Sequence, residues 1–158
     1  MEYISIKRKT LFIIAVLCAA FIISTVFCFM QGNVRRVFLF DSVDSASEHV
    51  ESRYLPKCRT KSENIRLFID ELLLGSFMDR SRPLFAAGTK ILSCYLRDNT
   101  LYLDLSSEAL LADMESSETK RAYQLLKKNV KLNFRGVKKY KVFIKGNEIF
   151  TENFAAGL

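Results

Sequence analysis

An unbroken apolar run is the first pattern along the chain. Residues 11–30 read LFIIAVLCAAFIISTVFCFM, twenty positions without a charge, a glycine or a proline. At about 1.5 Å per residue, a helix of this length covers roughly 30 Å, the thickness of a bilayer's hydrocarbon core. A cleaved signal peptide also has a basic start, but its apolar region spans only about 7–15 residues before small residues. We therefore expect a transmembrane signal anchor at residues 11–30, with a cleaved signal peptide or a buried helix of a soluble protein as the alternatives.

The charges on either side of this run predict how the chain is oriented. Three basic residues precede it at positions 7–9, and two follow it at positions 35–36. Because the cytoplasmic flank of a membrane helix carries the excess of Lys and Arg, we expect residues 1–10 to form a cytoplasmic basic tail. We then expect a single-pass protein of the cytoplasmic membrane, with its N-terminus inside and its folded domain outside. Cys18 and Cys28 each follow a large apolar residue, so neither fits a lipoprotein acceptor site.

Five short segments downstream have the composition of β-strands, rich in aliphatic, aromatic and β-branched residues. They cover residues 34–40, 49–55, 91–96, 100–105 and 140–144. Asp98-Asn99, between the third and fourth segments, predicts a tight hairpin because both residue types tolerate positive φ. Gly146-Asn147 predicts a turn after the last segment.

Two further stretches have the 3.6-residue period of amphipathic helices. In the first, Thr60 and Glu63 have the spacing of a capping box, Gly75 supplies the stop, and the apolar face consists of Ile65, Phe68, Ile69, Leu72 and Leu73. The second begins at about Ser117, after a short helical stretch from Ser106, and its apolar face consists of Ala122, Leu125, Leu126 and Val130. The order ββαββααβ predicts an α/β (α+β) domain at residues 34–152, with helices packed on a single mixed sheet.

Composition narrows the candidate chemistry of this domain. The 158 residues carry a net charge of +7 and include one histidine and four cysteines. His49 has no metal-ligand spacing around it, so we interpret it as a surface or structural residue and expect no metal and no cofactor. Cys58 and Cys94 can form a disulfide in an oxidising compartment, although Cys94 is also explained as a buried strand residue.

Eight cations near the C-terminus form the strongest charge feature, with no acidic residue between the first and the last. They are Lys127, Lys128, Lys131, Arg135, Lys138, Lys139, Lys141 and Lys145. One interpretation is a face for an anionic partner, such as wall glycan, lipid headgroups or an acidic protein. The other is a solvated helix end and strand edge, where lysines discourage edge-to-edge pairing. Nucleic acid is not expected, because the domain is placed outside the cytoplasm and lacks aromatic stacking motifs.

No residue pattern identifies a catalytic centre. The six glycines are isolated, so the sequence has no glycine-rich phosphate loop. Seventeen acidic residues make neighbouring carboxylates such as Asp70 and Glu71 inevitable, and their helical position predicts a solvated face. The sequence does not show a nucleophile grouped with a base and an orienting acid.

From about residue 36 to residue 150 the chain resembles the GerMN domain, a module of bacterial sporulation, spore-germination and cell-envelope proteins. The likeness is carried by residues 71–75 (ELLLG), 88–92 (GTKIL), 101–106 (LYLDLS) and 134–139 (FRGVKK), which lead to 142–146. The resemblance implies a fold similar to the ring-building folds of trans-envelope channels. It also implies a binding or assembly module, and it carries over no catalytic residue.

These features together predict a non-catalytic, membrane-anchored cell-envelope protein. Residues 11–30 attach it to the cytoplasmic membrane, and the outer domain binds another envelope protein, itself, peptidoglycan or anionic lipid. The alternative is a peptidoglycan-acting enzyme with an unrecognised site. A third hypothesis makes residues 127–145 a contact with the membrane surface.

Overall fold

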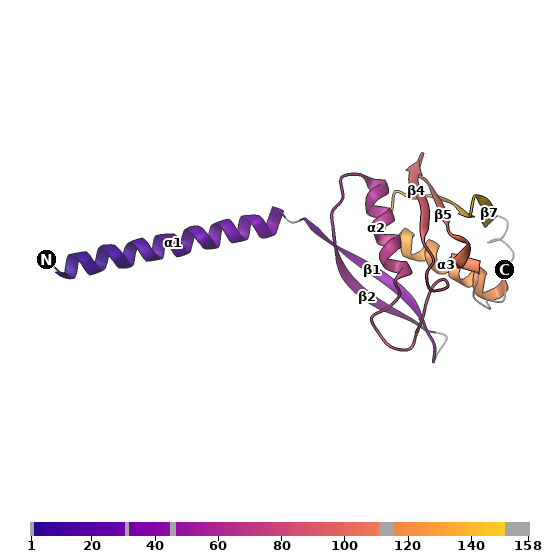
Figure 1. Ribbon diagram of the computed structural model, residues 1–158, viewed down its shortest axis with the longest axis horizontal. Coiled ribbons are helices and arrows are strands. Elements are labelled where there is room, and N and C mark those ends of the chain that lie inside the picture. Colours follow the sequence, from indigo (N-terminus) through magenta and orange to yellow (C-terminus); the bar gives the residue numbers. More distant parts are fainter. Residues whose placement is uncertain (1, 31, 45–46, 111–115, 151–158) are drawn as a thin grey trace. The chain divides into compact units, whose positions relative to one another are not determined.

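The computed structural model describes residues 2–30, 32–44, 47–110 and 116–150 (Figure 1). The chain divides into two compact units, Met1–Asn33 and Val34–Leu158.

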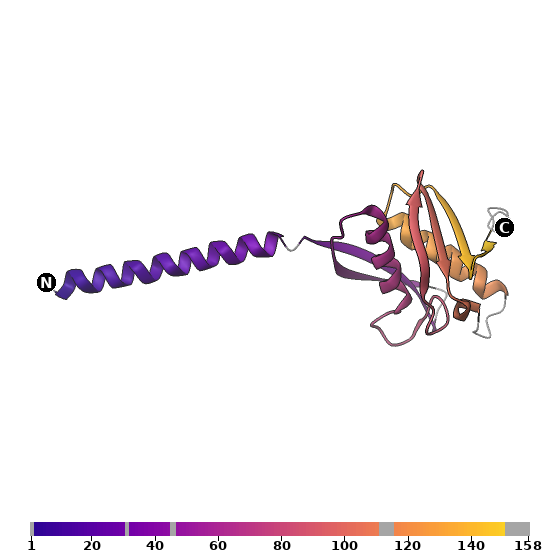
Figure 2. The ribbon, with the colours of Figure 1, turned by 45° about the horizontal axis from the view of Figure 1, so that its top comes forward.

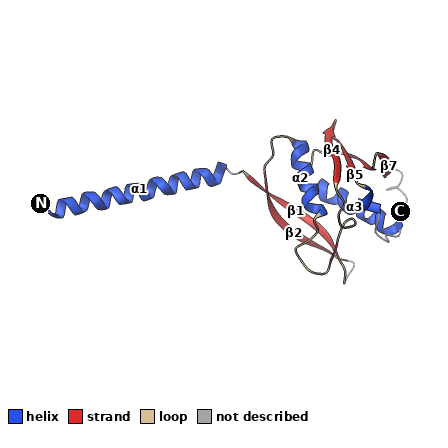
Figure 3. Ribbon diagram, viewed as in Figure 1, coloured by secondary structure: helices blue, strands red, loops and turns tan. Residues whose placement is uncertain are grey.

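The first unit consists of the helix α1, Glu2–Met30 (Figure 3). Within it, Thr10–Phe27 has a mean hydropathy of 2.7, and none of this stretch is buried in the structure. The Thr25 hydroxyl donates to the carbonyl oxygen of Phe21 at 2.7 Å, which satisfies a polar group within an apolar helix. By length and composition α1 is long and apolar enough to cross a membrane. A signal sequence near an N-terminus meets the same two criteria. Residues 2–10, which were predicted as part of a separate basic tail, belong to the same helix.

The second unit contains two sheets. The first has the order β2-β1-β3 and consists of β1 (Asn33–Ser42), β2 (Glu48–Pro56) and β3 (Ser81–Arg82). The second has the order β4-β5-β6-β7 and consists of β4 (Ile91–Arg97), β5 (Thr100–Leu105), β6 (Lys139–Ile144) and β7 (Asn147–Phe150). β5 and β6 are parallel, and the other neighbours in this sheet are antiparallel (Figure 2).

Two tight turns in the second sheet rely on positive φ. Asp98 and Asn99, with φ of 49° and 60°, join β4 to β5 and confirm the predicted hairpin. Lys145 and Gly146, with φ of 50° and 82°, join β6 to β7. This second turn lies one residue earlier than predicted, because Asn147 already pairs with Ile144 in the ladder.

Two helices cover the inner faces of these sheets. α2 (Lys61–Leu73) has the predicted capping box, in which the Glu63 amide donates to the Thr60 hydroxyl at 3.1 Å and the Thr60 amide donates to the Glu63 carboxylate at 3.0 Å. Gly75, with φ of 89°, follows its last turn and confirms the predicted stop. A 3₁₀ turn η1 (Ser107–Leu110) and the longer α3 (Ser116–Asn133) form the connection between the parallel strands.

The hydrophobic core lies where the helices meet both sheets. The Phe38 ring of β1 stacks on Phe68 of α2 with a centroid separation of 4.6 Å, and Phe68 meets Phe134 edge-on at 5.4 Å. The alternating leucines of β5 are buried, as are the inward residues of β6: Leu101, Leu103, Leu105, Val142 and Ile144. Aromatic packing across α2 therefore joins the first sheet to the rest of the domain.

The α/β class and the order of the predicted elements are confirmed, but the expectation of a single sheet requires correction. β1 and β2 form their own sheet with β3, and β3 and β7 are additional short strands. The physical reason is that α3, rather than a strand of the second sheet, occupies the free side of β1. Residues 151–152, at the end of the predicted domain, lie outside the described residues.

Candidate functional site

Asparagine side chains of α3 bind the backbone of β1. Asn129 is fully buried, and its side chain accepts from the Leu39 amide at 2.8 Å and donates to the Leu39 carbonyl oxygen at 2.9 Å. One helical turn later, Asn133 accepts from the Val37 amide at 2.9 Å and donates to the Val37 carbonyl oxygen at 2.6 Å. Each asparagine side chain thus makes the two hydrogen bonds that the backbone of a neighbouring strand would otherwise make. These bonds satisfy backbone amide and carbonyl groups of β1.

The spacing of these contacts explains why a helix can lie alongside a strand and bind successive residues of it. Four helical residues advance about 6 Å, and two strand residues advance about 6.7 Å, so successive contacts stay nearly in register. Farther along the same side, Arg121 of α3 binds the Asp41 carboxylate with two hydrogen bonds of 2.9 and 2.8 Å. The guanidinium lowers the pKa of Asp41 from its usual value.

Sequence reasoning missed this asparagine pair. Asn129 and Asn133 lie within a lysine-rich segment, where they read as part of a solvated polar face. Their spacing of four residues was the available signal, because asparagine is unfavourable inside a helix unless its side chain has a specific partner. The pair fixes the C-terminal half of α3, which carries three of the eight predicted cations.

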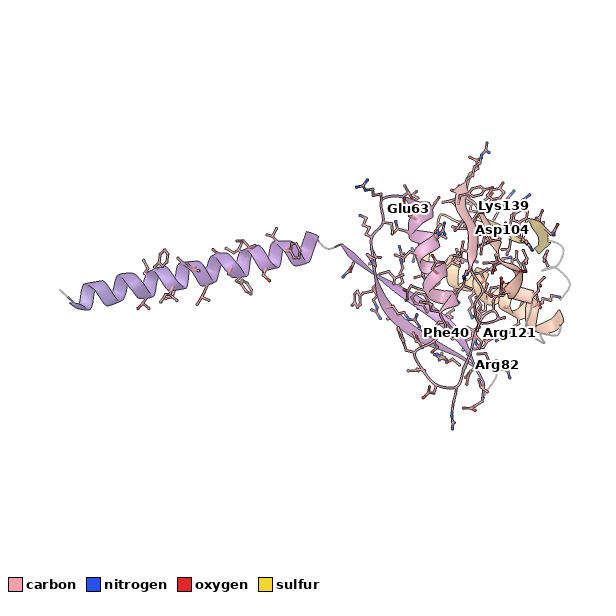
Figure 4. The ribbon with its side chains drawn as sticks, viewed as in Figure 1. Phe40, Glu63, Arg82, Asp104, Arg121 and Lys139 are labelled. Carbon is pink, nitrogen blue, oxygen red and sulfur yellow. The ribbon has the colours of Figure 1, made fainter. Side chains whose placement is uncertain are left out.

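An open hollow of about 770 Å³ extends along the C-terminal half of α3 and the start of β6. It is lined by Leu39, Tyr123, Lys127, Lys128, Lys131, Leu132, Arg135, Val137, Lys138, Lys139 and Tyr140. We call this feature the basic hollow, because six of the lining residues are cations and none is acidic. Figure 4 shows Lys139 on one side of the domain and Arg82 and Arg121 toward another.

The structure brings together six of the eight predicted cations and separates two. Lys127, Lys128, Lys131, Arg135, Lys138 and Lys139 line the basic hollow. Lys141 is exposed on β6, between the inward-facing residues of that strand, and Lys145 is exposed in the turn that follows. Neither residue lines the hollow, so substitutions of these two lysines can serve as a control for substitutions of the six cations that do.

Two cations of the basic hollow already have partners within the domain. Lys128 forms an ion pair with Glu48 of β2. The Lys127 ammonium lies 5.5 Å from the ring centroids of both Tyr123 and Tyr140, within cation–π range. These contacts hold the side chains of Lys127 and Lys128 against the domain.

The other four cations, Lys131, Arg135, Lys138 and Lys139, line the rest of the hollow, and we call this part its open end. In the described part of the chain, Lys131, Arg135, Lys138 and Lys139 have no acidic side chain within ion-pair distance. The turn that carries them is well held, because the amides of Lys138 and Lys139 both donate to the Asn99 carbonyl oxygen, at 2.8 and 3.2 Å. Four uncompensated positive groups on a fixed scaffold produce a local positive potential.

Tyr140 contributes a polar group to the same wall. Its hydroxyl oxygen is buried and has no hydrogen-bond partner among the described residues. Burial raises the pKa of this phenol above its usual value, so the hydroxyl keeps its proton and can donate. The wall of the hollow therefore contains a buried, protonated phenol beside its positive charges.

A second polar cluster lies where β2 meets the loop after α2. Arg53 is buried, and its guanidinium donates to Glu51 at 2.8 Å and to the carbonyl oxygens of Glu71 and Gly75 at 3.2 and 2.6 Å. Its guanidinium carbon lies 4.0 Å from the ring centroid of Phe77 in that loop. These contacts fasten the loop to the sheet, and sequence reasoning did not identify them.

His49 belongs to this cluster and has a structural environment. Its Nε2 atom lies 3.3 Å from the Glu51 carboxylate and 3.1 Å from each of the Ser76 and Ser81 hydroxyls. In a hydrolytic triad the acid and the serine bind opposite nitrogens of the imidazole. Here all three oxygens approach the same nitrogen, so this group does not have the arrangement that activates a serine.

The stability of the domain is expected to fall as pH is lowered through the acid range of Glu51. Burial alone would raise the pKa of this carboxyl, but hydrogen bonds from Ser76, Arg53, the Phe77 amide and His49 lower it from 4.5 to about 2. The unfolded chain binds the proton first, so this stabilisation is complete above pH 4.5 and is lost as the pH falls toward 2. We expect a loss of about 1–2 kcal/mol after solvent screening.

Denaturant unfolding at pH values on either side of this range measures that loss. Glu51→Gln removes the titrating group, and we expect this variant to show a flatter dependence of unfolding free energy on pH. An unchanged pH dependence in Glu51→Gln would show that another carboxyl is responsible.

The structure describes the two cysteines of the predicted disulfide and the residues that could bind a metal ion. Cys58 and Cys94 are both free thiols in the structure, and a disulfide between them in an oxidising compartment stays a prediction. Burial raises the pKa of the Cys94 thiol to about 12, which keeps it protonated and unreactive. Over the residues that the structure describes, no group of three His, Cys, Asp or Glu side chains could hold a metal ion.

Comparison with known proteins places the domain in a described family. A sequence model of the Germane family, described as "Sporulation and spore germination", matches residues 36–150. An uncharacterized lipoprotein of Treponema pallidum (strain Nichols) is 31% identical over 99 residues, which cover 63% of this chain and 74% of that protein.

Two solved structures from Bacillus subtilis share the fold. The first GerMN domain of the sporulation protein GerM matches with a TM-score of 0.55 at 19% identity, covering 73% of this chain and 86% of that one. The tandem GerMN domains of the same protein match with a TM-score of 0.56 at 18% identity, covering 75% of this chain and 41% of theirs. At this identity the likeness shows the fold, and the predicted GerMN-type domain is confirmed.

Proposed function

The chain belongs to the Germane family, and on that premise we propose that it is a single-pass, membrane-anchored protein of the bacterial cell envelope. Its outer domain is a non-catalytic binding module, and the basic hollow binds an anionic component of the envelope. The single observation that supports this role most strongly is the hollow itself, lined by six cations and no acid.

The helix α1 supports the anchoring part of the proposal. Its apolar side chains are solvent-exposed in the structure, including Leu11 at 72%, Phe12 at 70% and Phe21 at 74%. Such a surface is stable in a bilayer and unstable in water. The Treponema pallidum relative is named a lipoprotein, which is also a membrane-attached class of envelope protein. The excess of basic residues before the helix favours an N-terminus in the cytoplasm.

The lack of acidic partners for four of the cations supports the proposal that the domain binds an anion. A purely solvated lysine face usually carries acids among its cations, whereas four cations here share one end of a hollow without an acidic neighbour. Bringing like charges together on a rigid surface raises the free energy of the domain slightly, and an anionic ligand removes that repulsion. A complementary anion is therefore the partner that the geometry fits.

Affinity capture from detergent-solubilised envelopes tests this function with the full-length chain. Two charge-matched variants are compared with the wild type: the hollow variant, Lys131→Glu/Lys138→Glu, and the sheet variant, Lys141→Glu/Lys145→Glu. We expect the hollow variant to capture about tenfold less of the envelope component than the wild type, because two attractive charges become repulsive. The sheet variant, which has the same net charge, is expected to capture as much as the wild type.

Equal capture by the hollow variant and the wild type would contradict a role for the basic hollow. Recovery of the protein alone, as a monomer after crosslinking in membranes, would contradict the binding module as a whole. Incubation of the full-length protein with purified peptidoglycan addresses the enzymatic alternative, and turnover of that material would overturn the non-catalytic assignment. Thermal unfolding of all variants checks that each one is folded.

A further inference from the structure

We infer that the open end of the basic hollow binds the phosphate groups of anionic phospholipids, in the same membrane leaflet from which the domain emerges. This inference rests on the proposed function, because it needs both the anchor and an anionic partner. It identifies that partner as a lipid surface and gives the domain a second contact with the membrane besides its helix.

Three of the four cations at the open end of the hollow follow the end of α3 in the chain. The end of α3 is bound to the start of β1, because Arg36 donates to the Asn133 carbonyl oxygen at 3.0 Å and lies over the Phe134 ring at 4.3 Å. Arg135 follows Phe134 directly, and Lys138 comes three residues after Arg135. Arg135 therefore lies beside the first residues of β1, and the chain runs from there to Lys138 and Lys139, whose amides bind Asn99.

Only a short stretch of chain separates the membrane helix from β1. α1 ends at Met30, and β1 begins at Asn33. Arg36 is thus six residues beyond the helix, which an extended chain spans in at most about 20–22 Å. A domain tethered this closely presents some of its surface to the lipid headgroups, and the part nearest to the tether is the start of β1 with the end of α3.

The surface at that end of the domain is basic. Lys131, Arg135, Lys138 and Lys139 have no acidic partner in the described part of the domain, and basic residues beside a membrane are attracted to anionic headgroups. Lys127 and Lys128 are occupied by tyrosine rings and by Glu48, so the cations that remain available are those at the open end.

An exposed leucine distinguishes a lipid surface from a soluble anionic polymer. Leu132 lines the hollow and is 52% exposed, although cations stand on both sides of it along the chain. An apolar side chain set among basic residues, in a hollow that tyrosines also line, is typical of surfaces that lie at the boundary between headgroups and acyl chains. A phosphate polymer in water would gain nothing from Leu132, whereas a bilayer would.

Hydrogen–deuterium exchange of the full-length protein in lipid nanodiscs tests this inference. One set of nanodiscs contains phosphatidylcholine alone, and the other contains phosphatidylcholine and phosphatidylglycerol in equal amounts. The anchor holds the protein in both sets, so a difference between them reports the headgroup contact of the domain. We expect exchange in residues 131–139 to slow by about tenfold on the anionic nanodiscs, and this slowing to be lost at high salt.

The variants and a soluble probe make the result specific. The hollow variant is expected to lose the slowing, the sheet variant to keep it, and Leu132→Ser to reduce it while leaving the net charge unchanged. Equal exchange on both sets of nanodiscs, while a soluble anionic wall polymer slows exchange in residues 131–139, would overturn the lipid assignment and leave the proposed function standing. Failure of both probes, together with equal capture by the hollow variant, would overturn both.

Discussion

Replacing Asn129 with alanine is expected to lower the free energy of unfolding by about 3 kcal/mol. The substitution removes the acceptor of the Leu39 amide and the donor to the Leu39 carbonyl oxygen, at a position with no exposed surface. Each buried backbone group left without a partner costs about 1–3 kcal/mol, and water cannot easily take the place of the side chain here. Chemical denaturation of the wild type and the variant measures the difference.

Asn133→Ala is the matched control for this prediction. It removes the equivalent pair of bonds to Val37, but these bonds are only partly buried. Water can reach the freed groups, so we expect a loss of about 1 kcal/mol. Equal losses for the two variants would show that burial does not determine the contribution of this pair. A loss near zero for Asn129→Ala would show that α3 does not depend on these bonds for its position on β1.

Replacing Arg53 with methionine is expected to destabilise the domain by about 3–5 kcal/mol, because it leaves the buried Glu51 carboxylate without its cation. The carbonyl oxygens of Glu71 and Gly75 lose a donor at the same time. Methionine keeps much of the volume of the arginine stem between the aromatic rings, so the loss reports polar contacts more than packing. The loop that contains Phe77 is expected to become more accessible to proteases.

A double-mutant cycle with Glu51→Gln separates the charge pair from the remaining contacts of Arg53. Glu51→Gln/Arg53→Met is expected to be less destabilised than the sum of its two single variants, since the unpaired carboxylate is absent. Additive losses would show that the pair is not coupled, and that the contacts of Arg53 with the carbonyl oxygens account for the effect.

Local signals in the sequence were sufficient for most secondary structure. The capping box at Thr60, the stop at Gly75 and the hairpin at Asp98-Asn99 each depend on neighbouring residues, and each is confirmed. The boundaries between sheets could not be predicted in this way. Which strands share a sheet depends on residues distant in the chain, and here the side chains of Asn129 and Asn133 occupy the edge of β1.

The sequence predicted a cationic candidate site from a run of basic residues, but it could not predict which of these residues lie together. A lysine on β6 and one in the next turn look equivalent to those of α3 in a list of cations. Only the packing of α3 against β6 separates Lys141 and Lys145 from the six that line the hollow. The ion pair of Lys128 with Glu48, eighty residues earlier, is likewise a tertiary contact that reduces the number of available cations.

The sequence by itself determined the apolar helix, the α/β class and the cationic character of the C-terminal third, because hydrophobic period, turn residues and charge are properties of short segments. Tertiary structure alone decided that the domain has two sheets, that asparagines join α3 to β1, and that a buried arginine holds the loop after α2. It also decided which cations share one hollow and which of them lack an acidic neighbour. These properties depend on desolvation and on contacts between distant residues, which arise only when the chain is packed.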